Sequence, residues 1–268
     1  MGILVGCQTY TWEMLGDRFT GTPEDILDAM AAAGYEGVEF TNSTIGHFAG
    51  RPDVFRAAVE QRGMKVAAFA YATTGFTDPA RSDEDLTGAM AAVEFVAALG
   101  VPLCLGGPAA PMREGYDALL AQAVGFYSQV AEAGAQRGVT VCVHPHSHHG
   151  SLLESADEYA RLLDATRESG LMFNPDAGHI ARGGQDVLAC FRAHRSRIAY
   201  VHVKDVDAMG QWRPLGAGVI PWRELFAFLR ATGYDGWATA EEESAEAHKD
   251  PAGAVRANRE FLRGLLGT

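Results

Sequence analysis

Cysteine is scarce in this chain of 268 residues, and its few copies are widely separated. The four cysteines are Cys7, Cys104, Cys142 and Cys190, and three of them lie within apolar runs typical of strands. Buried reduced thiols have this distribution, whereas a disulfide framework in a small secreted protein needs many cysteines in a short chain. The sequence therefore argues against a disulfide-stabilised fold, and we expect a cytoplasmic protein.

The chain also has fewer basic than acidic residues. Lysine and arginine number 22 against 34 aspartates and glutamates, which gives a formal net charge of −12. Such a surface repels phosphate backbones and anionic lipid. We therefore expect no nucleic-acid partner and no membrane partner.

The chain has no long uninterrupted apolar run. The segment 88–112 contains a single charged residue before Arg113, Glu94, but Gly100, Pro102 and the turn at 106–108 divide it into a helix and a strand. The first residues have no basic region, and Gly6 stands where a myristoylation signal needs serine or threonine. We expect neither a transmembrane segment nor a targeting segment.

Apolar residues make up 47% of the chain, which is ample for a large core. Short β-branched or aliphatic runs alternate with longer amphipathic ones, which is the pattern of repeated βα units around a parallel sheet. The start of the first long helix is marked by Thr22, Pro23 and two acidic residues, and its end by Gly34. The predicted strands are 3–10, 37–40, 65–72, 102–106, 139–144, 171–174, 198–203 and 236–241, and the predicted helices 22–34, 52–63, 82–100, 114–138, 155–166, 186–197, 221–233 and 251–266.

Eight βα units in about 250 residues are what a closed (β/α)₈ barrel requires. Open doubly wound sheets usually have fewer strands. The sequence therefore predicts an α/β fold in which residues 1–268 form a single TIM-barrel domain. In such a barrel the chemistry lies at the carboxyl ends of the strands.

Four of the nine histidines fall within the window 144–149, directly after a predicted strand. Neutral imidazole is a common ligand of divalent transition metals, although short histidine-rich tracts also occur as solvated loops. The neighbouring strand ends decide between these interpretations. They carry Asp176 and His179, then His202 and Lys204, then Glu241.

A ligand-type side chain thus follows each of four consecutive strands, which is hard to explain as coincidence. The set is His144, Asp176, His202 and Glu241. Its two nitrogens and two carboxylates suit Mn²⁺, Co²⁺, Fe²⁺ or Zn²⁺ better than Ca²⁺. The sequence predicts a site for one divalent metal, with Mn²⁺ or Co²⁺ preferred and Zn²⁺, Fe²⁺ or Mg²⁺ as other candidates.

Several motifs carry a family resemblance when they are taken in order. They are Asn-Pro-Asp176-Ala-Gly-His179, Tyr-Val-His202-Val-Lys204-Asp205, Pro214-Leu-Gly-Ala-Gly-Val-Ile-Pro-Trp222 and Gly236-Trp-Ala-Thr-Ala-Glu241. In this order the chain resembles the sugar isomerase/epimerase superfamily of xylose-isomerase-like TIM barrels. That resemblance implies one divalent metal held by Glu, Asp, His and Glu, of which Asp176, His202 and Glu241 match by position.

His144 stands where the epimerases and ketol isomerases of that superfamily carry their first glutamate. Only Glu241 then remains of the two carboxylates that exchange a proton in the epimerases. The His144-Pro-His146 sequence resembles inosose dehydratases, which favours a lyase that removes water from a keto-cyclitol or keto-sugar. Glu241 is the expected base, and His146 or His179 the expected acid, because elimination needs one of each.

Other residues near the strand ends are weaker candidates for substrate binding. They are Glu39, Lys204, Trp12 and Arg213, and each has a structural alternative: Glu39 as a salt-bridge partner, and Lys204 with Asp205 as a solvated pair. His148 and His149 are expected to be loop residues rather than ligands.

Three other functions stay open at this point. One is a metal-dependent ketose isomerase or 3-epimerase, and another is a non-catalytic sugar-binding barrel. A DNA-repair endonuclease on the same barrel would need more zinc ligands and a basic surface, which the acidic chain does not offer. The absence of a glycine-rich phosphate loop favours an unphosphorylated sugar or cyclitol as the small-molecule partner, and a homodimer or homotetramer is left open.

Overall fold

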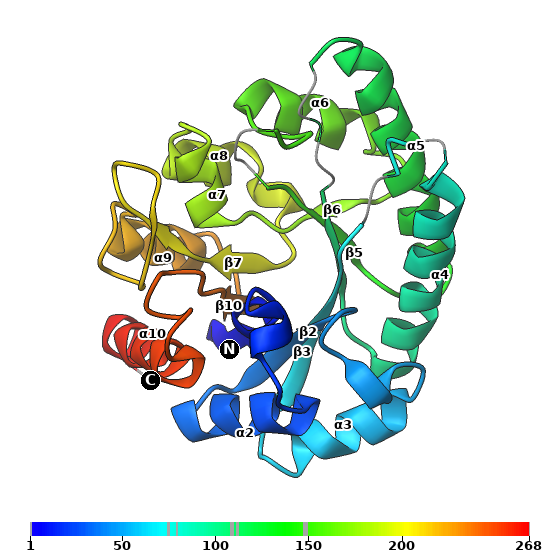
Figure 1. Cartoon of the computed structure of the whole chain (residues 1–268). Coiled ribbons are helices and arrows are strands. Elements are labelled where there is room, and N and C mark those ends of the chain that lie inside the picture. The colour runs from blue at the N-terminus through cyan, green and yellow to red at the C-terminus, as the bar shows by residue number, and fades with distance from the viewer. Residues whose placement is uncertain are drawn as a thin grey trace. The chain divides into compact units, whose positions relative to one another are not determined.

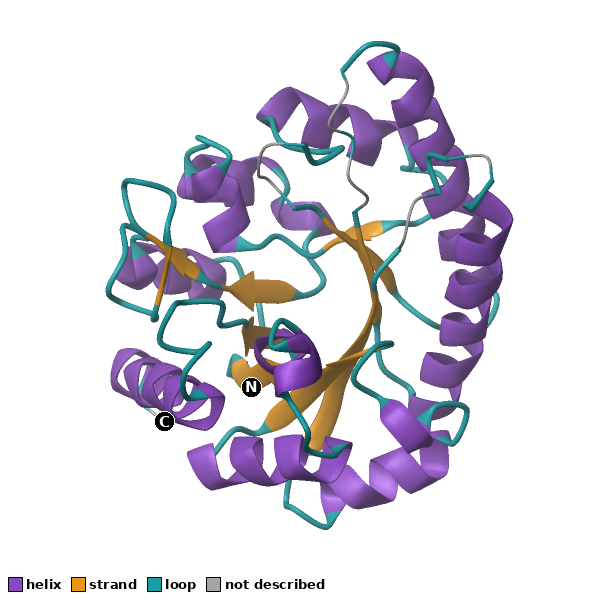
Figure 2. Cartoon of the chain, viewed as in Figure 1, coloured by secondary structure: helices purple, strands orange, loops and turns teal. Residues whose placement is uncertain are grey.

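The computed structural model describes residues 2–73, 76–78, 80–107, 110, 113–146 and 150–267. The chain divides into two compact units. The first unit comprises Met1–Ala67 and Val201–Thr268, and the second unit comprises Ala68–Tyr200. Both contain strands and helices, which Figure 2 distinguishes by colour.

The first unit contains a parallel sheet of four strands in the order β2-β1-β10-β7. A short antiparallel hairpin, β8 with β9, follows β7. The helices α2 and α10 lie side by side in this unit (Figure 1). The strands are β1 (Leu4–Gln8), β2 (Gly37–Thr41), β7 (Val201–Val203), β8 (Asp205–Val206), β9 (Trp212–Arg213) and β10 (Trp237–Ala240), and the helices are α1 (Tyr10–Glu13), η1 (Gly16–Arg18), α2 (Pro23–Ala33), η2 (Gly46–Phe48), α3 (Pro52–Glu60), α9 (Trp222–Ala231) and α10 (Pro251–Leu266).

The second unit contains parallel strands in the order β3-β4-β5-β6, with β3 beginning at the end of the first unit. Phe173 of β6 also pairs in parallel with Ile198. The helices α4 and α5 lie side by side (Figure 1). The strands are β3 (Lys65–Tyr71), β4 (Leu103–Gly106), β5 (Val141–His144) and β6 (Met172–Phe173), and the helices are α4 (Ser82–Leu99), α5 (Tyr116–Ala135), α6 (Ala156–Ala165), α7 (Ala177–Arg182), α8 (Val187–Ala193) and η3 (Arg195–Arg197).

The two units together supply eight parallel strands that alternate with helices, as the sequence predicts. Every residue of β2 and β5 is buried, which is typical of parallel strands covered on both faces. The prediction of a single domain over 1–268 stays a prediction. Within the described part of the chain, no helix combines the length and the apolarity needed to cross a membrane.

The start and end of α2 follow from its sequence. Thr22 accepts a hydrogen bond from the N–H of Asp25, and the Asp25 carboxylate accepts one from the N–H of Thr22, which makes a capping box. Pro23 occupies the first turn, where its missing N–H costs nothing. Gly34 ends the helix at a φ of 85°, a left-handed conformation that favours glycine. The predicted helix 22–34 is confirmed.

Among the short elements that were not predicted, three come directly after strands. They are α1, α7 and the β8–β9 hairpin, of four, six and two plus two residues. Segments this short contain too few residues for a hydrophobic period to be recognised. The first predicted strand was correspondingly too long, because the chain turns into α1 at Tyr10.

Two glycines of α5 allow a matched test of how this helix packs. A Cβ on Gly134 would lie 2.6 Å from Cγ2 of Val141 and 3.2 Å from the carbonyl oxygen of Val139, whereas a Cβ on Gly125 would meet nothing within 4 Å. We predict that Gly134→Ala lowers the free energy of unfolding by about 1–3 kcal/mol because the contact is too close. Gly125→Ala should raise it by about 0.5–1 kcal/mol through helix propensity. Urea unfolding followed by circular dichroism measures both, and equal shifts would contradict the packing.

Candidate functional site

The imidazole of His202 in β7 lies between two buried carboxylates of the first unit. Its Nε2 is 3.0 Å from one oxygen of Glu39 and 3.1 Å from the other, and its Nδ1 is 3.0 Å from Oε2 of Glu241. Burial lowers the pKa of His202, but the two carboxylates outweigh burial and raise it to about 10. This is a position where the protein stabilises positive charge.

That arrangement fits a metal ligand. A carboxylate can only accept, so Nε2 of His202 donates its proton to Glu39. Nδ1 lies 3.0 Å from Oε2 of Glu241, and a cation bound between these two atoms would take the place of the Nδ1 proton. Metal-binding histidines commonly donate their other ring N–H to a carboxylate in this way. Glu39 therefore contacts His202 in this structure and orients its ring.

Lys204 is buried beside the same carboxylate. Its Nζ donates to Oε1 of Glu241 at 2.7 Å, contacts Oε1 of Glu243, and lies 4.8 Å from the centre of the Trp212 ring. Burial raises the pKa of Glu243 to about 7, with Lys204 opposing that rise. The Lys204–Asp205 pair that the sequence suggested is not a solvated bridge, because both side chains are buried and the lysine pairs with the two glutamates.

Asp205 organises the loop that follows the hairpin. Its carboxylate accepts from the N–H groups of Gly216 at 2.8 Å and Gly218 at 3.2 Å, and from Nε1 of Trp222 at 2.9 Å. A Cβ on Gly218 would lie 2.1 Å from Oδ1 of Asp205, so only glycine allows this approach. The Pro214–Trp222 motif is thus folded around one buried carboxylate.

Trp12 and Arg213 lie in different surroundings. Trp12 is buried in α1 and lines a cavity of about 340 Å³ with Glu13, Phe19 and Ser43 among others. Arg213 in β9 is exposed, and its guanidinium pairs with Asp207 at 2.8 Å. Their roles in substrate binding stay predictions.

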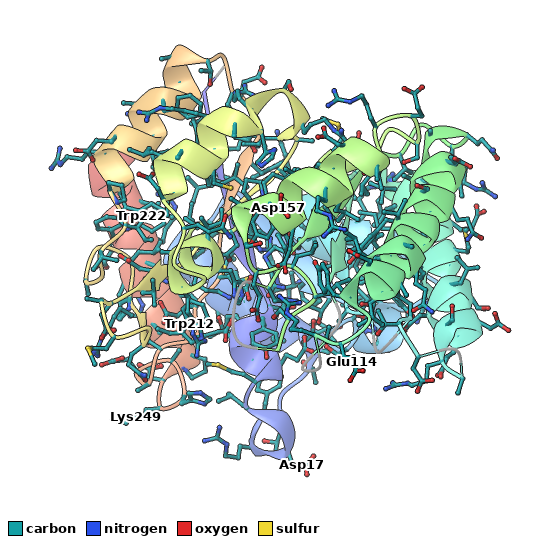
Figure 3. The ribbon with its side chains drawn as sticks, turned by 90° about the horizontal axis from the view of Figure 1, so that it is seen from above. Asp17, Glu114, Asp157, Trp212, Trp222 and Lys249 are labelled. Carbon is teal, nitrogen blue, oxygen red and sulfur yellow. The ribbon has the colours of Figure 1, made fainter. Side chains whose placement is uncertain are left out.

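The loops that follow β1, β7 and β10 meet at one end of the first unit. Figure 3 shows Asp17 and Lys249, which belong to the loops after β1 and β10, toward the same edge, while Trp222 lies away from it. Nη2 of Arg18 lies 3.1 Å from Nδ1 of His248, which joins the first and last of these loops. This end carries His202, Lys204 and Glu241.

In the second unit, His144 ends β5 and Asp176 follows β6. Both side chains are buried, and Nε2 of His144 lies 3.7 Å from Oδ2 of Asp176. That distance is too long for a hydrogen bond, but two atoms that bind the same cation at about 2.1 Å are typically about 3–4 Å apart. The other oxygen of Asp176 accepts from the N–H of His179 at 2.8 Å and so begins α7, which fixes the carboxylate.

Two further imidazoles surround this pair. The rings of His146 and His179 are 5.0 Å apart, and they lie 5.0 and 5.8 Å from the ring of His144. Nδ1 of His146 is 3.1 Å from the carbonyl oxygen of Gly107, which can only accept, so Nδ1 carries a proton. His148 and His149 lie outside the described residues.

The sequence did not predict the ion pair of Glu243 with Lys204, nor the hydrogen bonds that Asp205 accepts from the loop after the hairpin. The signal for Glu243 was its spacing of two from Glu241, because alternate residues of an extended segment share a side. For Asp205 it was the cluster of glycines downstream, which bring backbone N–H groups close to an acceptor.

Comparison with known proteins identifies the family. Residues 27–265 match the model of the xylose isomerase-like TIM barrel family. The chain belongs to this family. The predicted (β/α)₈ fold class is thereby confirmed, and the resemblance found in the sequence motifs with it.

Proteins with similar sequences include inosose dehydratases. The chain is 25% identical to that of Geobacillus kaustophilus over 94% of its own length and 89% of that enzyme, and 26% identical to that of Yersinia enterocolitica, with 92% and 91% covered. Among solved structures it is similar to the IolI protein with zinc (TM-score 0.83, 14% identity, 99% and 98% covered). It is also similar to 3-keto-D-glucoside 4-epimerase YcjR from E. coli (TM-score 0.78, 16% identity, 99% and 100% covered).

The contacts of Asp205 lead to a stability prediction. Asp205→Asn places an amide donor against N–H donors, and hydrogen bonds to a charged group contribute about 1.5–3 kcal/mol each. We expect the free energy of unfolding to fall by about 2–3 kcal/mol in urea unfolding followed by tryptophan fluorescence. The control is Asp235→Asn, which changes an exposed carboxylate of the same unit. Similar stability of the two variants would show that Asp205 does not hold the loop.

Proposed function

We propose that this chain is a divalent-metal-dependent lyase that removes water from a keto-cyclitol or a keto-sugar. The observation that carries the proposal is the imidazole of His144, which faces Asp176 at the end of β5. The resemblance of the sequence motifs implies a glutamate at this position in the two-base epimerases. An imidazole there leaves Glu241 as the carboxylate base. The inosose dehydratase relatives support the same reaction class.

The proposed metal ligands are His144 and Asp176 from the second unit with His202 and Glu241 from the first. Each pair fits a cation on its own: the first by its separation of 3.7 Å, and the second by an imidazole nitrogen facing a carboxylate oxygen at 3.0 Å. Mixed nitrogen and oxygen donors suit Mn²⁺ or Co²⁺, with Zn²⁺, Fe²⁺ or Mg²⁺ as other candidates. The zinc named with the IolI structure is in keeping with such a site in this family.

A divalent metal bound there would supply Lewis acidity toward the substrate carbonyl and make the neighbouring C–H more acidic. Glu241 takes the proton from the carbon next to the carbonyl, and Lys204 holds its other oxygen at 2.7 Å. The electron pair of that C–H bond forms a carbon–carbon double bond as the β-hydroxyl departs. His146 or His179 donates the proton with which this hydroxyl leaves as water.

The remaining side chains would position these groups. Glu39 orients His202, Lys204 orients Glu241, and Trp12 and Arg213 belong to segments that could contact substrate. We propose a cytoplasmic enzyme whose partner is a small unphosphorylated sugar or cyclitol and whose domain extends over 1–268.

Product analysis tests the proposed reaction. Incubation of the Mn²⁺-loaded protein with keto-inositols, keto-glycosides and ketohexoses should give a product that is lighter by one water and absorbs in the ultraviolet. Mass spectrometry and absorbance are measured on the same sample. A new isomer of unchanged mass would instead establish an isomerase or epimerase, and binding without conversion would establish a sugar-binding protein.

The contact between Glu39 and His202 predicts an effect on metal affinity. Glu39→Gln keeps the side-chain size but removes the charge that orients the ring, and loss of such a partner typically weakens metal binding by about 10–100-fold. Competition with a chromophoric chelator measures the Mn²⁺ affinity. The matched control is Glu24→Gln, which also breaks a glutamate–histidine pair, Glu24 with the exposed His47. An unchanged affinity in Glu39→Gln would show that the Glu39–His202 contact does not support metal binding.

A further inference from the structure

Lys204 lies among the buried ionisable side chains at the strand ends of the first unit, and its ammonium group already forms ion pairs with two glutamates. Its Nζ lies 2.7 Å from Glu241 and contacts Glu243, and only about 1% of its side chain is exposed. The Trp212 ring covers the same nitrogen at 4.8 Å. With both glutamates ionised, the three side chains have a net charge of −1.

Of the two carboxylates, only Glu241 is needed for the proposed chemistry. Glu241 also faces His202, whereas Glu243 is two residues further along and contacts Lys204 through Oε1. A lysine that paired with Glu241 alone would form a neutral pair, with further N–H groups able to donate to an anion. The carboxylate of Glu243 occupies another N–H group of Lys204 and repels an approaching anion.

Two arginines that follow strands also form ion pairs or hydrogen bonds with other groups of the protein. Arg213 pairs with Asp207 in the first unit. In the second unit, Arg113 donates to Glu158 at 2.9 Å and to the carbonyl oxygen of Ser151 at 3.1 Å. Each of these guanidinium groups is held by protein acceptors.

We infer that Glu243 is a specificity-determining residue, which adds a negative charge to the neutral Lys204–Glu241 pair and thereby excludes substrates that carry a carboxylate or a phosphate. This inference rests on the proposed function and restricts its substrate to uncharged polyhydroxy ketones. An anion that approached Lys204 would meet two carboxylates at the same nitrogen. Each charge at this distance changes the binding energy of the anion, because Lys204 and Glu241 are buried and Glu243 is largely shielded from solvent.

Sulfate binding to the Mn²⁺-loaded protein tests the inference without requiring turnover. Isothermal titration calorimetry with sodium sulfate at pH 8 is carried out on the wild type, Glu243→Gln and the double variant Lys204→Met/Glu243→Gln. Glu243→Gln should bind sulfate about tenfold more tightly than the wild type, a modest Coulomb effect at short range. The double variant should return to the wild-type affinity.

The control variant is Glu246→Gln, which removes an exposed carboxylate from the same segment after β10. It should leave the sulfate affinity unchanged, and an equal gain in Glu246→Gln would reduce the effect to net charge and overturn the inference. A gain in Glu243→Gln that persists in the double variant would also overturn it, since Lys204 would not be the cation involved. Glu243→Ser makes the same test if circular dichroism shows that Glu243→Gln is unfolded.

A turnover measurement separates this inference from the reaction itself. With a neutral keto-inositol and a cyclic ketone that carries a carboxylate, the ratio of the two kcat/KM values should shift toward the anionic ketone in Glu243→Gln. No dehydration of either ketone by the wild type contradicts the proposed function, while the sulfate titration still decides the role of Glu243. Dehydration with no shift in that ratio contradicts the inference alone.

Discussion

The contacts of the His202 imidazole with Glu39 on one side and Glu241 on the other are the interaction on which the rest of this site depends. Three buried ionisable groups at contact distance would be costly unless their charges were balanced, because burial penalises each of them. The two carboxylates favour a positive charge between them, and they therefore raise the pKa of His202. Lys204 supplies one cation on the far oxygen of Glu241, and a divalent metal is proposed to supply the other.

The fold was predictable because its signals are local and repeated. A capping box and a terminal glycine define α2, and short, mainly apolar strands such as β5 can be recognised without tertiary information. Helix α7 and the β8–β9 hairpin were missed, since each depends on one carboxylate that accepts backbone N–H groups. Asp176 begins α7 through the N–H of His179, and Asp205 gathers N–H groups of residues that are distant in sequence.

The candidate site could be predicted as a set of residues but not as a set of contacts. Placing His202 and Glu241 at strand ends requires only the period of the sheet, and the two are adjacent because β7 pairs with β10. The sequence could not say that Glu39 would face Nε2 of His202, because β2 and β7 are far apart in the chain. The sequence also suggested Asp205 as the partner of Lys204, because adjacent residues are easier to pair than residues in different strands. In the structure Lys204 pairs with Glu241 and Glu243 instead.

Charge balance also explains why a site rich in carboxylates can remain selective. Glu241 must keep one oxygen available for a cation and a proton, so Lys204 occupies the other. A lysine in that position would attract anions of every kind, including phosphate, which is abundant in cells. A second carboxylate two residues away removes the attraction without displacing the lysine, because alternate residues of an extended segment lie on the same side. The spacing of Glu241 and Glu243 therefore links the position of the base to the charge of the molecules that can approach it.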